Sequence, residues 1–312
     1  MKFALIALAL ACGCAVWWAQ SDPTRAINVL TQAWLSAQGK VGSTQLNQPY
    51  GPGAAQQSDV YLPPADLPRP AHGWPVVVFF HGGSWVRGHR SEYRFVGQAL
   101  ASRGMVAVMA DYRLYPEVKY PEFLRDGAAL VAWVLQQAPT WQADAHQVFT
   151  MGHSAGAYNA AMLAVDPRWL GEVGLSPQAL AGWIGLAGPY DFLPIEDVEV
   201  KPVFDHPHSP PDSQVVFHAR VGGPPAWLAY APQDPYVNPQ VNSIRLGERL
   251  RALGVPSTLR EVAQANHVSL VGMLSPVLSP WVPLLDEVSD FVHHTQGPRP
   301  QTEAVFSRPA SS

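Results

Sequence analysis

The chain has 312 residues and a formal net charge of −4, and charged residues make up only 14% of it, below the roughly 25% of an ordinary soluble domain. It contains no long basic run, which argues against nucleic-acid binding. Its two cysteines, Cys12 and Cys14, both lie near the N-terminus, so the rest of the chain offers no thiol nucleophile, no cysteine-ligated metal site and no internal disulfide.

The N-terminal segment is apolar. Lys2 is followed by an apolar run over residues 3–19, which is the pattern of a secretory signal. An uncleaved membrane anchor is the alternative, although a spanning helix needs about 20 apolar residues, and Cys12 or Cys14 could instead carry a lipid after cleavage. We therefore expect residues 1–20 to direct export, to the periplasm, to the exterior or to a membrane-attached location.

Segments typical of strands and helices alternate through residues 21–296. A helix is expected to start at Ser21-Asp22-Pro23, where a capping side chain precedes a proline in the first turn, and to end at Gly39. Apolar runs predict strands at 59–62, 76–80, 105–110, 148–151, 183–186, 226–230 and 257–262. Helical patterns are found at 91–103, from 121 onward, and at 155–164, 239–253 and 282–293. This alternation predicts an α/β fold with a mostly parallel central sheet and helices on both faces.

One connection is much longer than the others. Residues 189–225 are rich in Pro, His and Asp, and long irregular loops of this kind are typical of lids or binding loops. We interpret the segment as a loop insertion within a single domain at 21–296. The polar tail at 297–312 is expected to be disordered.

Gly152-His153-Ser154-Ala155-Gly156 matches the G-x-S-x-G nucleophile turn. An apolar strand leads into it and a helix of small residues leads out, which is the context that such a turn requires. The turn imposes strained backbone angles on the serine, and the flanking glycines leave room for it. Ser154 is therefore the predicted nucleophile, with a purely structural turn as the alternative.

A second glycine-containing turn follows the buried strand at 76–80. The segment His81-Gly82-Gly83-Ser84-Trp85 matches the HGGG-type loop whose backbone N–H groups bind an oxyanion. Glycine lets the backbone approach the developing charge without a side chain in the way. We expect the N–H groups of Gly83, Ser84 and Ala155 to form an oxyanion hole, with a plain tight turn as the alternative.

A catalytic triad on this scaffold needs an acid and a histidine downstream, in the order Ser, Asp, His. His267 lies in the loop after the last predicted strand. The other downstream histidines lie elsewhere: His206, His208 and His218 precede that strand, and His293 and His294 end the last predicted helix. Asp234 follows the preceding strand, at 226–230, and is the favoured acid, while Asp191, after an earlier strand, would serve only in a variant arrangement. Asp111 and Asp126 precede the serine and are interpreted as structural.

Taken together, these segments resemble the esterase branch of the α/β-hydrolases related to hormone-sensitive lipase, including bacterial feruloyl-esterase-like and kynurenine-formamidase-like enzymes. The resemblance covers residues 27–293. The segments that carry it are Tyr50-Gly51, Asp59-Val60-Tyr61-Leu62-Pro63, His81 to Trp85, Asp111-Tyr112-Arg113-Leu114, Gly152 to Gly156, Gly188 to Asp191, and Asp234 with His267. The family often has Gly or Ala where Ser84 stands, and glycine where Val268 stands.

The resemblance implies the α/β-hydrolase fold and a serine hydrolase that cleaves small carboxylic esters through an acyl-enzyme, with no metal or organic cofactor. Short or aromatic acyl groups are expected, because Trp85 follows the oxyanion loop and would place a bulky ring near the acyl site. His153 and Tyr190 are further candidates for the substrate pocket. An amide hydrolase of the formamidase or peptidase type is one alternative. A non-catalytic ligand-binding protein, which would typically lack a triad member, is the other.

Overall fold

The computed structural model describes residues 22–297. The strands, in chain order, are β1 (Thr44–Pro49), β2 (Gln57–Tyr61), β3 (Trp74–Phe80), β4 (Val106–Ala110), β5 (Ala143–His153), β6 (Gly182–Leu186), β7 (Ala226–Tyr230) and β8 (Ser257–Glu261). The α-helices are α2 (Pro23–Ala37), α3 (Arg94–Ala101), α4 (Glu122–Gln137), α5 (Ala155–Val165), α6 (Pro167–Gly171), α7 (Arg245–Ala252), α8 (His267–Gly272) and α9 (Leu284–His294). The predicted export segment and the predicted tail beyond Gly297 lie outside the described residues and stay predictions.

All the strands of this described part belong to one eight-stranded sheet, in the order β1-β2-β4-β3-β5-β6-β7-β8. β1 and β2 pair antiparallel, as do β2 and β4, and every pair from β4 to β8 is parallel. The predicted α/β architecture with a mostly parallel sheet is therefore confirmed.

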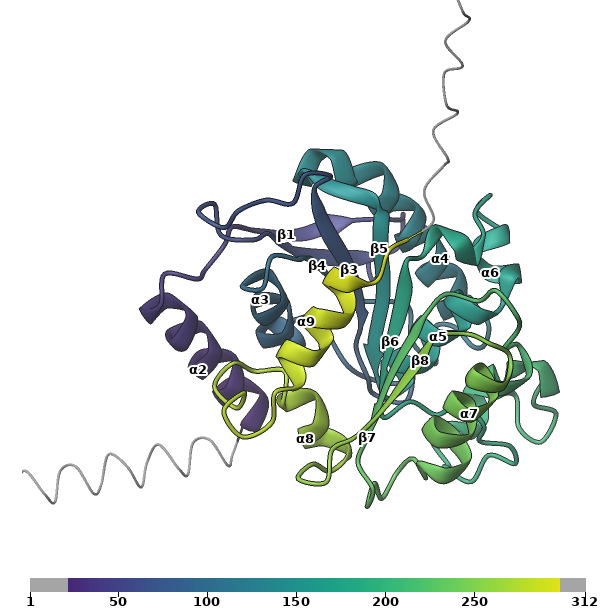
Figure 1. Cartoon of the computed structure of the whole chain (residues 1–312). Coiled ribbons are helices and arrows are strands. Elements are labelled where there is room, and N and C mark those ends of the chain that lie inside the picture. Colours follow the sequence, from purple (N-terminus) through teal and green to yellow (C-terminus); the bar gives the residue numbers. More distant parts are fainter. Residues whose placement is uncertain (1–21, 298–312) are drawn as a thin grey trace, which may run out of the picture.

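Helices cover both faces of the sheet. Figure 1 shows α2, α3 and α9 on one side and α4, α5, α6 and α7 on the other. The buried side chains divide in the same way: Val76 and Val78 of β3 belong to the cluster under α4 and α5, and Val77 and Phe79 to the cluster under α3 and α9. Because both faces are covered, β3 is apolar at successive positions instead of alternating.

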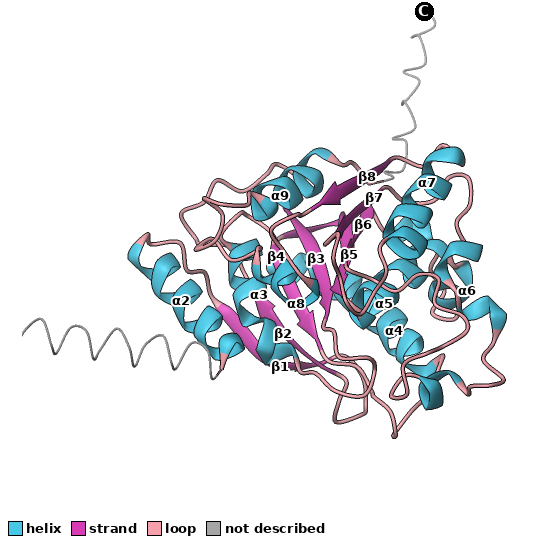
Figure 2. Ribbon diagram, turned by 90° about the horizontal axis from the view of Figure 1, so that it is seen from below, coloured by secondary structure: helices cyan, strands magenta, loops and turns pink. Residues whose placement is uncertain are grey.

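The register of the parallel strands brings the candidate site together at their carboxyl ends. Phe80, which precedes the HGGS loop, lies opposite Gly152 on the neighbouring strand. His153 in turn lies opposite Leu186, the last residue of β6. Two turns that are about 70 residues apart in the sequence thus leave the sheet side by side, and Figure 2 views the molecule from this edge, with α8 in front of the strands.

Several elements differ from the sequence-based expectation. The predicted helix at 91–103 is a 3₁₀ turn, η1 (Arg90–Tyr93), followed by α3. The helix expected at 239–253 begins with a π-helical turn, η7 (Gln240–Ile244), before α7. The pattern did not predict β1, because its mostly polar residues are largely exposed and lack the apolar alternation that indicates a half-buried strand.

The insertion at 189–225 contains no long helix. It is irregular apart from the 3₁₀ turns η4 (Lys201–Phe204), η5 (Pro211–Ser213) and η6 (Val215–Phe217). Gly297, the first residue of the predicted tail, is buried against the backbone of His146.

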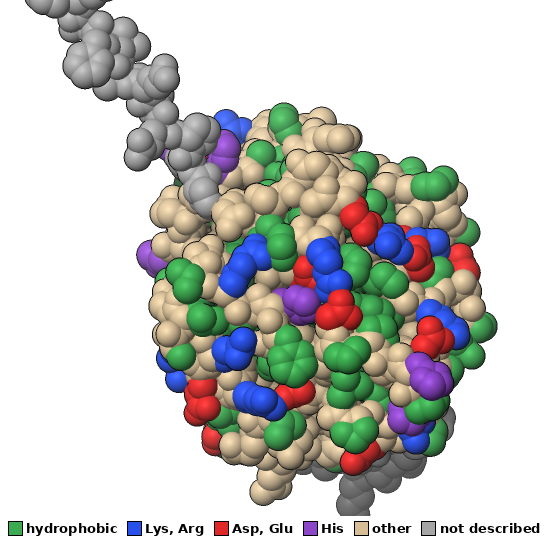
Figure 3. Space-filling model, turned by 90° about the vertical axis from the view of Figure 1, so that its right-hand side faces the viewer, with side chains coloured by type: hydrophobic (Ala, Val, Ile, Leu, Met, Phe, Trp, Pro, Cys, Tyr) green, Lys and Arg blue, Asp and Glu red, His purple; other side chains and the backbone are tan. Residues whose placement is uncertain are grey.

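The surface is mixed in charge. On the face in Figure 3, acidic and basic side chains are interspersed with hydrophobic ones. Among residues 22–297, no helix combines the length and the apolar character needed to cross a membrane.

Candidate active site

Ser154 occupies a strained turn between β5 and α5. Its backbone angles are φ 55° and ψ −122°, a conformation that costs free energy for a residue with a side chain. Its N–H donates to the carbonyl of Leu186 at 2.8 Å, which fixes the turn against β6. A side chain at Gly156 would place a Cβ atom 2.0 Å from the carbonyl oxygen of Phe80, so glycine is required where α5 packs on the end of β3.

The loop after β3 lies directly beside the serine. A Cβ atom at Gly82 would be 3.2 Å from the Cβ of Ser154. Gly83 has φ +117°, in the region that favours glycine, and its carbonyl accepts the N–H groups of Val86 and Arg87 at 3.0 Å each. Ser84, the next residue within this turn, also has a positive φ.

The N–H groups predicted to form the oxyanion hole are available. No acceptor within residues 22–297 binds the N–H of Gly83, Ser84 or Ala155. Ala155 is the first residue of α5, and the first N–H groups of a helix have no partner within the helix. These three donors lie on the two adjoining turns, so they suit a negatively charged oxygen bound at Ser154.

His267 contacts the serine. Its Nε2 lies 2.9 Å from Ser154 Oγ, and its side chain is only 9% exposed. The backbone that carries His267 is fixed at the start of α8 by a capping box. Asn266 Oδ1 accepts the N–H groups of Val268 and Ser269, and Ser269 Oγ accepts the N–H of Asn266. The cap fixes the backbone beside the histidine without using its ring. Val268, which replaces the glycine common in the family, points its side chain to solvent and is 65% exposed.

Asp234, and not Asp191, contacts His267. Asp234 Oδ2 lies 2.6 Å from His267 Nδ1, and its Oδ1 accepts the N–H groups of Tyr236 and Val237 at 2.9 Å each. Burial by itself would raise the pKa of Asp234, but the hydrogen bonds from His267 and from these two N–H groups outweigh it and hold the pKa below its ordinary value. Asp234 therefore stays ionised beside the imidazole.

The alternative acid has a different partner. The carboxylate of Asp191 pairs with Arg245, and its backbone N–H donates to Asn242 at 2.8 Å. Asp111 and Asp126, interpreted as structural, bind Arg90 and Arg113 respectively. Within residues 22–297, no group of three or more potential ligands is placed to hold a metal ion.

The three candidate pocket residues require correction, because all are buried against protein. Tyr190 is 0% exposed, and its hydroxyl lies where Cβ atoms on Gly185 and Gly188 would be, 1.9 and 2.4 Å away. Its ring therefore fills the core instead of facing a substrate. Trp85 is 2% exposed and donates its indole N–H to Asn159 at 3.0 Å. His153 is 5% exposed and contacts the backbone of His267.

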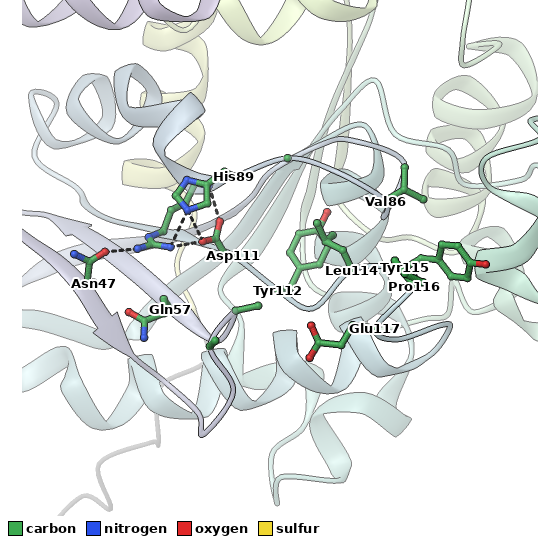
Figure 4. A pocket seen from close by; sticks show the side chains of 14 residues that line it. Asn47, Gln57, Val86, His89, Asp111, Tyr112, Leu114, Tyr115, Pro116 and Glu117 are labelled. Atoms are coloured by element: carbon green, nitrogen blue, oxygen red, sulfur yellow. Dashed lines mark hydrogen bonds and ion pairs between the residues drawn. The ribbon is translucent and has the colours of Figure 1, made fainter.

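The pocket in Figure 4 lies elsewhere. It has a volume of about 920 Å³ and is lined on one side by His89 and Asp111 and on the other by Val86, Leu114 and Tyr115. Ser154 and His267 are not part of its lining. The pocket therefore does not include the candidate nucleophile.

Two residues near the site were missed by the sequence-based reasoning. Tyr93 accepts a hydrogen bond from Gly82 and contacts His153, and nothing in its local sequence indicates this. Asn266 could have been recognised, because Asn266-His267-Val268-Ser269 has the spacing of a helix cap.

The free energy of unfolding is expected to fall in mild acid, with His153 as one cause. Burial, and then the charge that His267 can carry, lower the pKa of His153 to about 3, whereas a histidine in an unfolded chain titrates near about 6.5. Between these pH values the unfolded state binds the additional proton, so stability is lost as the pH falls below 6.5, by about 2 kcal/mol at pH 5.

Urea unfolding at pH 7 and pH 5 measures this loss. In the His153→Gln variant, which has no titrating group at this position, the difference between the two pH values should be smaller by about 2 kcal/mol. An equal difference in both proteins would contradict a buried neutral imidazole.

Comparison with known proteins shows which family the chain resembles. Residues 58–209 match the family model BD-FAE. Esterase LipI of Mycobacterium tuberculosis is 32% identical over 240 residues, which cover 70% of this chain and 72% of LipI. A probable isoprenylcysteine alpha-carbonyl methylesterase of Arabidopsis thaliana, ICMEL1, is 27% identical over 62% of this chain, which spans only 40% of that protein.

Among solved structures, the butyrate-bound esterase Est2 of Thermogutta terrifontis superimposes with a TM-score of 0.64 at 23% identity, over 84% of this chain and 97% of that one. This likeness supports the same fold. The sequence match to LipI covers more than two thirds of both proteins. The chain therefore belongs to the α/β-hydrolase family of esterases that includes LipI and contains the BD-FAE domain.

Proposed function

We propose that this protein is a serine carboxylesterase that cleaves esters of short or aromatic acyl groups. The observation that carries the proposal is the unbroken chain of contacts from Ser154 Oγ through His267 to Asp234, beside N–H groups able to bind an oxyanion. The names of the relatives support an ester substrate, since LipI is an esterase and ICMEL1 a probable methylesterase.

The geometry supports a two-step mechanism. His267 Nε2 takes the proton of Ser154 Oγ as this oxygen attacks the ester carbonyl, and the resulting oxyanion is bound by the N–H groups of Gly83, Ser84 and Ala155. Collapse of this intermediate expels the alcohol, which receives the proton from His267. Water, activated in turn by the same imidazole, then releases the acid from the acyl-enzyme.

The role of Asp234 follows from its contacts. By accepting the Nδ1–H of His267 it leaves Nε2 unprotonated and facing the serine, and its charge stabilises the imidazolium that forms. A non-catalytic protein of this fold would typically lack one of these groups, whereas Ser154, His267 and Asp234 are all present and in contact here.

Aromatic packing beneath the oxyanion loop supports a small acyl group. The ring of Trp85 has its centroid 4.9 Å from that of Phe204, 5.2 Å from that of Tyr158 and 6.1 Å from that of Phe192. Phe192 and Phe204 belong to the insertion. The insertion is thus tied by ring contacts to the loop beside Ser154, and the rigidity of this cover supports our proposal of a small acyl group.

A series of p-nitrophenyl esters, from acetate to palmitate and including benzoate, tests the proposal. We expect kcat/KM to be highest for short or aromatic acyl groups and to fall beyond medium chains, although each methylene that finds an apolar surface could add about 0.8 kcal/mol of binding. The matched p-nitroanilides serve as the comparison. A steady rise to long chains would contradict the closed acyl site, and faster cleavage of the anilides would indicate an amide hydrolase.

A further inference from the structure

A chain of hydrogen bonds links the residues next to the proposed catalytic groups. The N–H of Gly82 donates to the hydroxyl oxygen of Tyr93 at 3.2 Å. The Tyr93 hydroxyl lies 3.3 Å from His153 Nδ1, and His153 Nε2 lies 2.8 Å from the carbonyl oxygen of His267. The chain therefore begins in the oxyanion loop, passes next to the nucleophile and ends on the backbone of the histidine that contacts it.

The chemistry of the groups determines every proton in this chain. A backbone N–H can only donate, so Tyr93 accepts from Gly82 and uses its own proton toward His153 Nδ1. A carbonyl can only accept, so His153 carries its proton on Nε2 and donates it to His267. The chain thus has a single arrangement of donors and acceptors.

Both side chains keep this arrangement over the ordinary pH range. Burial raises the pKa of Tyr93 to about 12 and lowers the pKa of His153 to about 3. His153 therefore stays neutral although its ring centroid is only 5.1 Å from that of His267. It supplies a directed hydrogen bond to the catalytic loop without adding a charge.

The two ends of this hydrogen-bond chain adjoin the groups that the proposed reaction must align. Gly82 adjoins Gly83 of the oxyanion loop, and His153 adjoins Ser154. Three segments from different parts of the sequence must be held within fractions of an ångström for the reaction proposed above. Tyr93, at the end of η1, connects the oxyanion loop to the nucleophile turn and, through His153, to the backbone of His267.

We propose that Tyr93 and His153 are positioning residues, which hold the oxyanion loop, the nucleophile turn and the backbone of His267 in register through this hydrogen-bond chain. The inference rests on the proposed esterase function. Because both side chains hydrogen-bond to the protein and neither belongs to the triad or the oxyanion donors, we expect their loss to lower kcat while leaving KM nearly unchanged.

The first test is Tyr93→Phe, which removes the hydroxyl and keeps the ring packed against Phe79, whose centroid is 5.2 Å away. We expect kcat for p-nitrophenyl acetate to fall by about 10-fold to 100-fold, the scale expected for a small misplacement of reacting groups. Tyr50→Phe is the matched control, because it also deletes a buried hydroxyl, one that donates to the carbonyl of Asp111 at 2.6 Å. It should lower the melting temperature without lowering kcat.

The second test concerns His153. In His153→Gln the amide retains one donor and one acceptor, so we expect most of kcat to be kept, whereas His153→Phe should lose as much as Tyr93→Phe. The double variant Tyr93→Phe/His153→Phe should lose little more than either single variant, because both break the same chain. Additive losses, or a wild-type kcat in Tyr93→Phe, would overturn the proposal.

Labelling of Ser154 by a fluorophosphonate separates this inference from the proposed function. The reagent reports on the activated serine whatever the acyl preference of the enzyme. Failure of the wild-type protein to react would contradict the proposed function itself. Rapid labelling of the wild type with an equal rate in Tyr93→Phe would contradict the positioning role alone.

Discussion

Replacement of Ser154 by alanine is expected to lower kcat for p-nitrophenyl acetate by about 10⁶-fold, since the members of a triad act as one unit. The variant should remain folded, because the Oγ atom hydrogen-bonds to His267, while the strained turn is held by backbone hydrogen bonds and by Gly152 and Gly156. Loss of the side chain leaves only substrate binding and the oxyanion hole to accelerate the reaction.

Ser102→Ala is the matched control, because it also deletes one hydroxyl from a buried serine, whose Oγ donates to the carbonyl of Ala99 at 2.7 Å. Its position at the end of α3 is remote from the nucleophile, and kcat should be unchanged. If Ser154→Ala retained a tenth of the activity, Ser154 would not be the nucleophile.

Replacement of Asp234 by asparagine is expected to lower kcat by about 10⁴-fold. An amide that donates toward Nδ1 favours the opposite tautomer of His267, which carries its proton on Nε2. A protonated Nε2 cannot accept the proton of Ser154. The hydrogen bonds from the N–H groups of Tyr236 and Val237 can still be accepted by the amide oxygen, so the loop should keep its shape.

Asp191→Asn is the comparison for this experiment. Its side chain is 12% exposed and pairs with Arg245 instead of His267, so the substitution removes no contact with the imidazole. We expect kcat of this variant to stay within a few-fold of the wild type. The reverse ranking of the two variants would move the acid to Asp191.

The nucleophile turn and the oxyanion loop were readable in the sequence because their signals are local. A buried strand, a turn with glycines at fixed offsets and a helix of small residues follow one another within about 20 residues. The strained φ of Ser154 arises inside that unit, whereas the close approach of Gly156 to Phe80 at the end of β3 is a contact between distant segments. His267 was also predictable, because chain order places it after the last strand.

The choice of acid needed the tertiary structure. β6 and β7 are adjacent parallel strands, so Asp191 and Asp234 both follow strands that end at the same edge of the sheet. Chain order favoured Asp234, but only the folded arrangement shows its carboxylate against His267 and that of Asp191 against Arg245.

The direction of individual side chains likewise depended on the fold. Tyr190 follows a glycine-containing turn near the site, yet its ring enters the core, because Gly185 and Gly188 leave a space that only the folded chain reveals.

By itself, then, the sequence was enough to predict the fold class, the candidate nucleophile, the loop beside it and the histidine, since each depends on hydrophobic periodicity, on chain order or on a turn made by neighbouring residues. Only the tertiary structure decided the partner of the histidine, the burial of Trp85, His153 and Tyr190, and the link through Tyr93. The physical reason is that a hydrogen bond between segments 60 or 114 residues apart depends on which polar groups the packed core leaves within reach of one another.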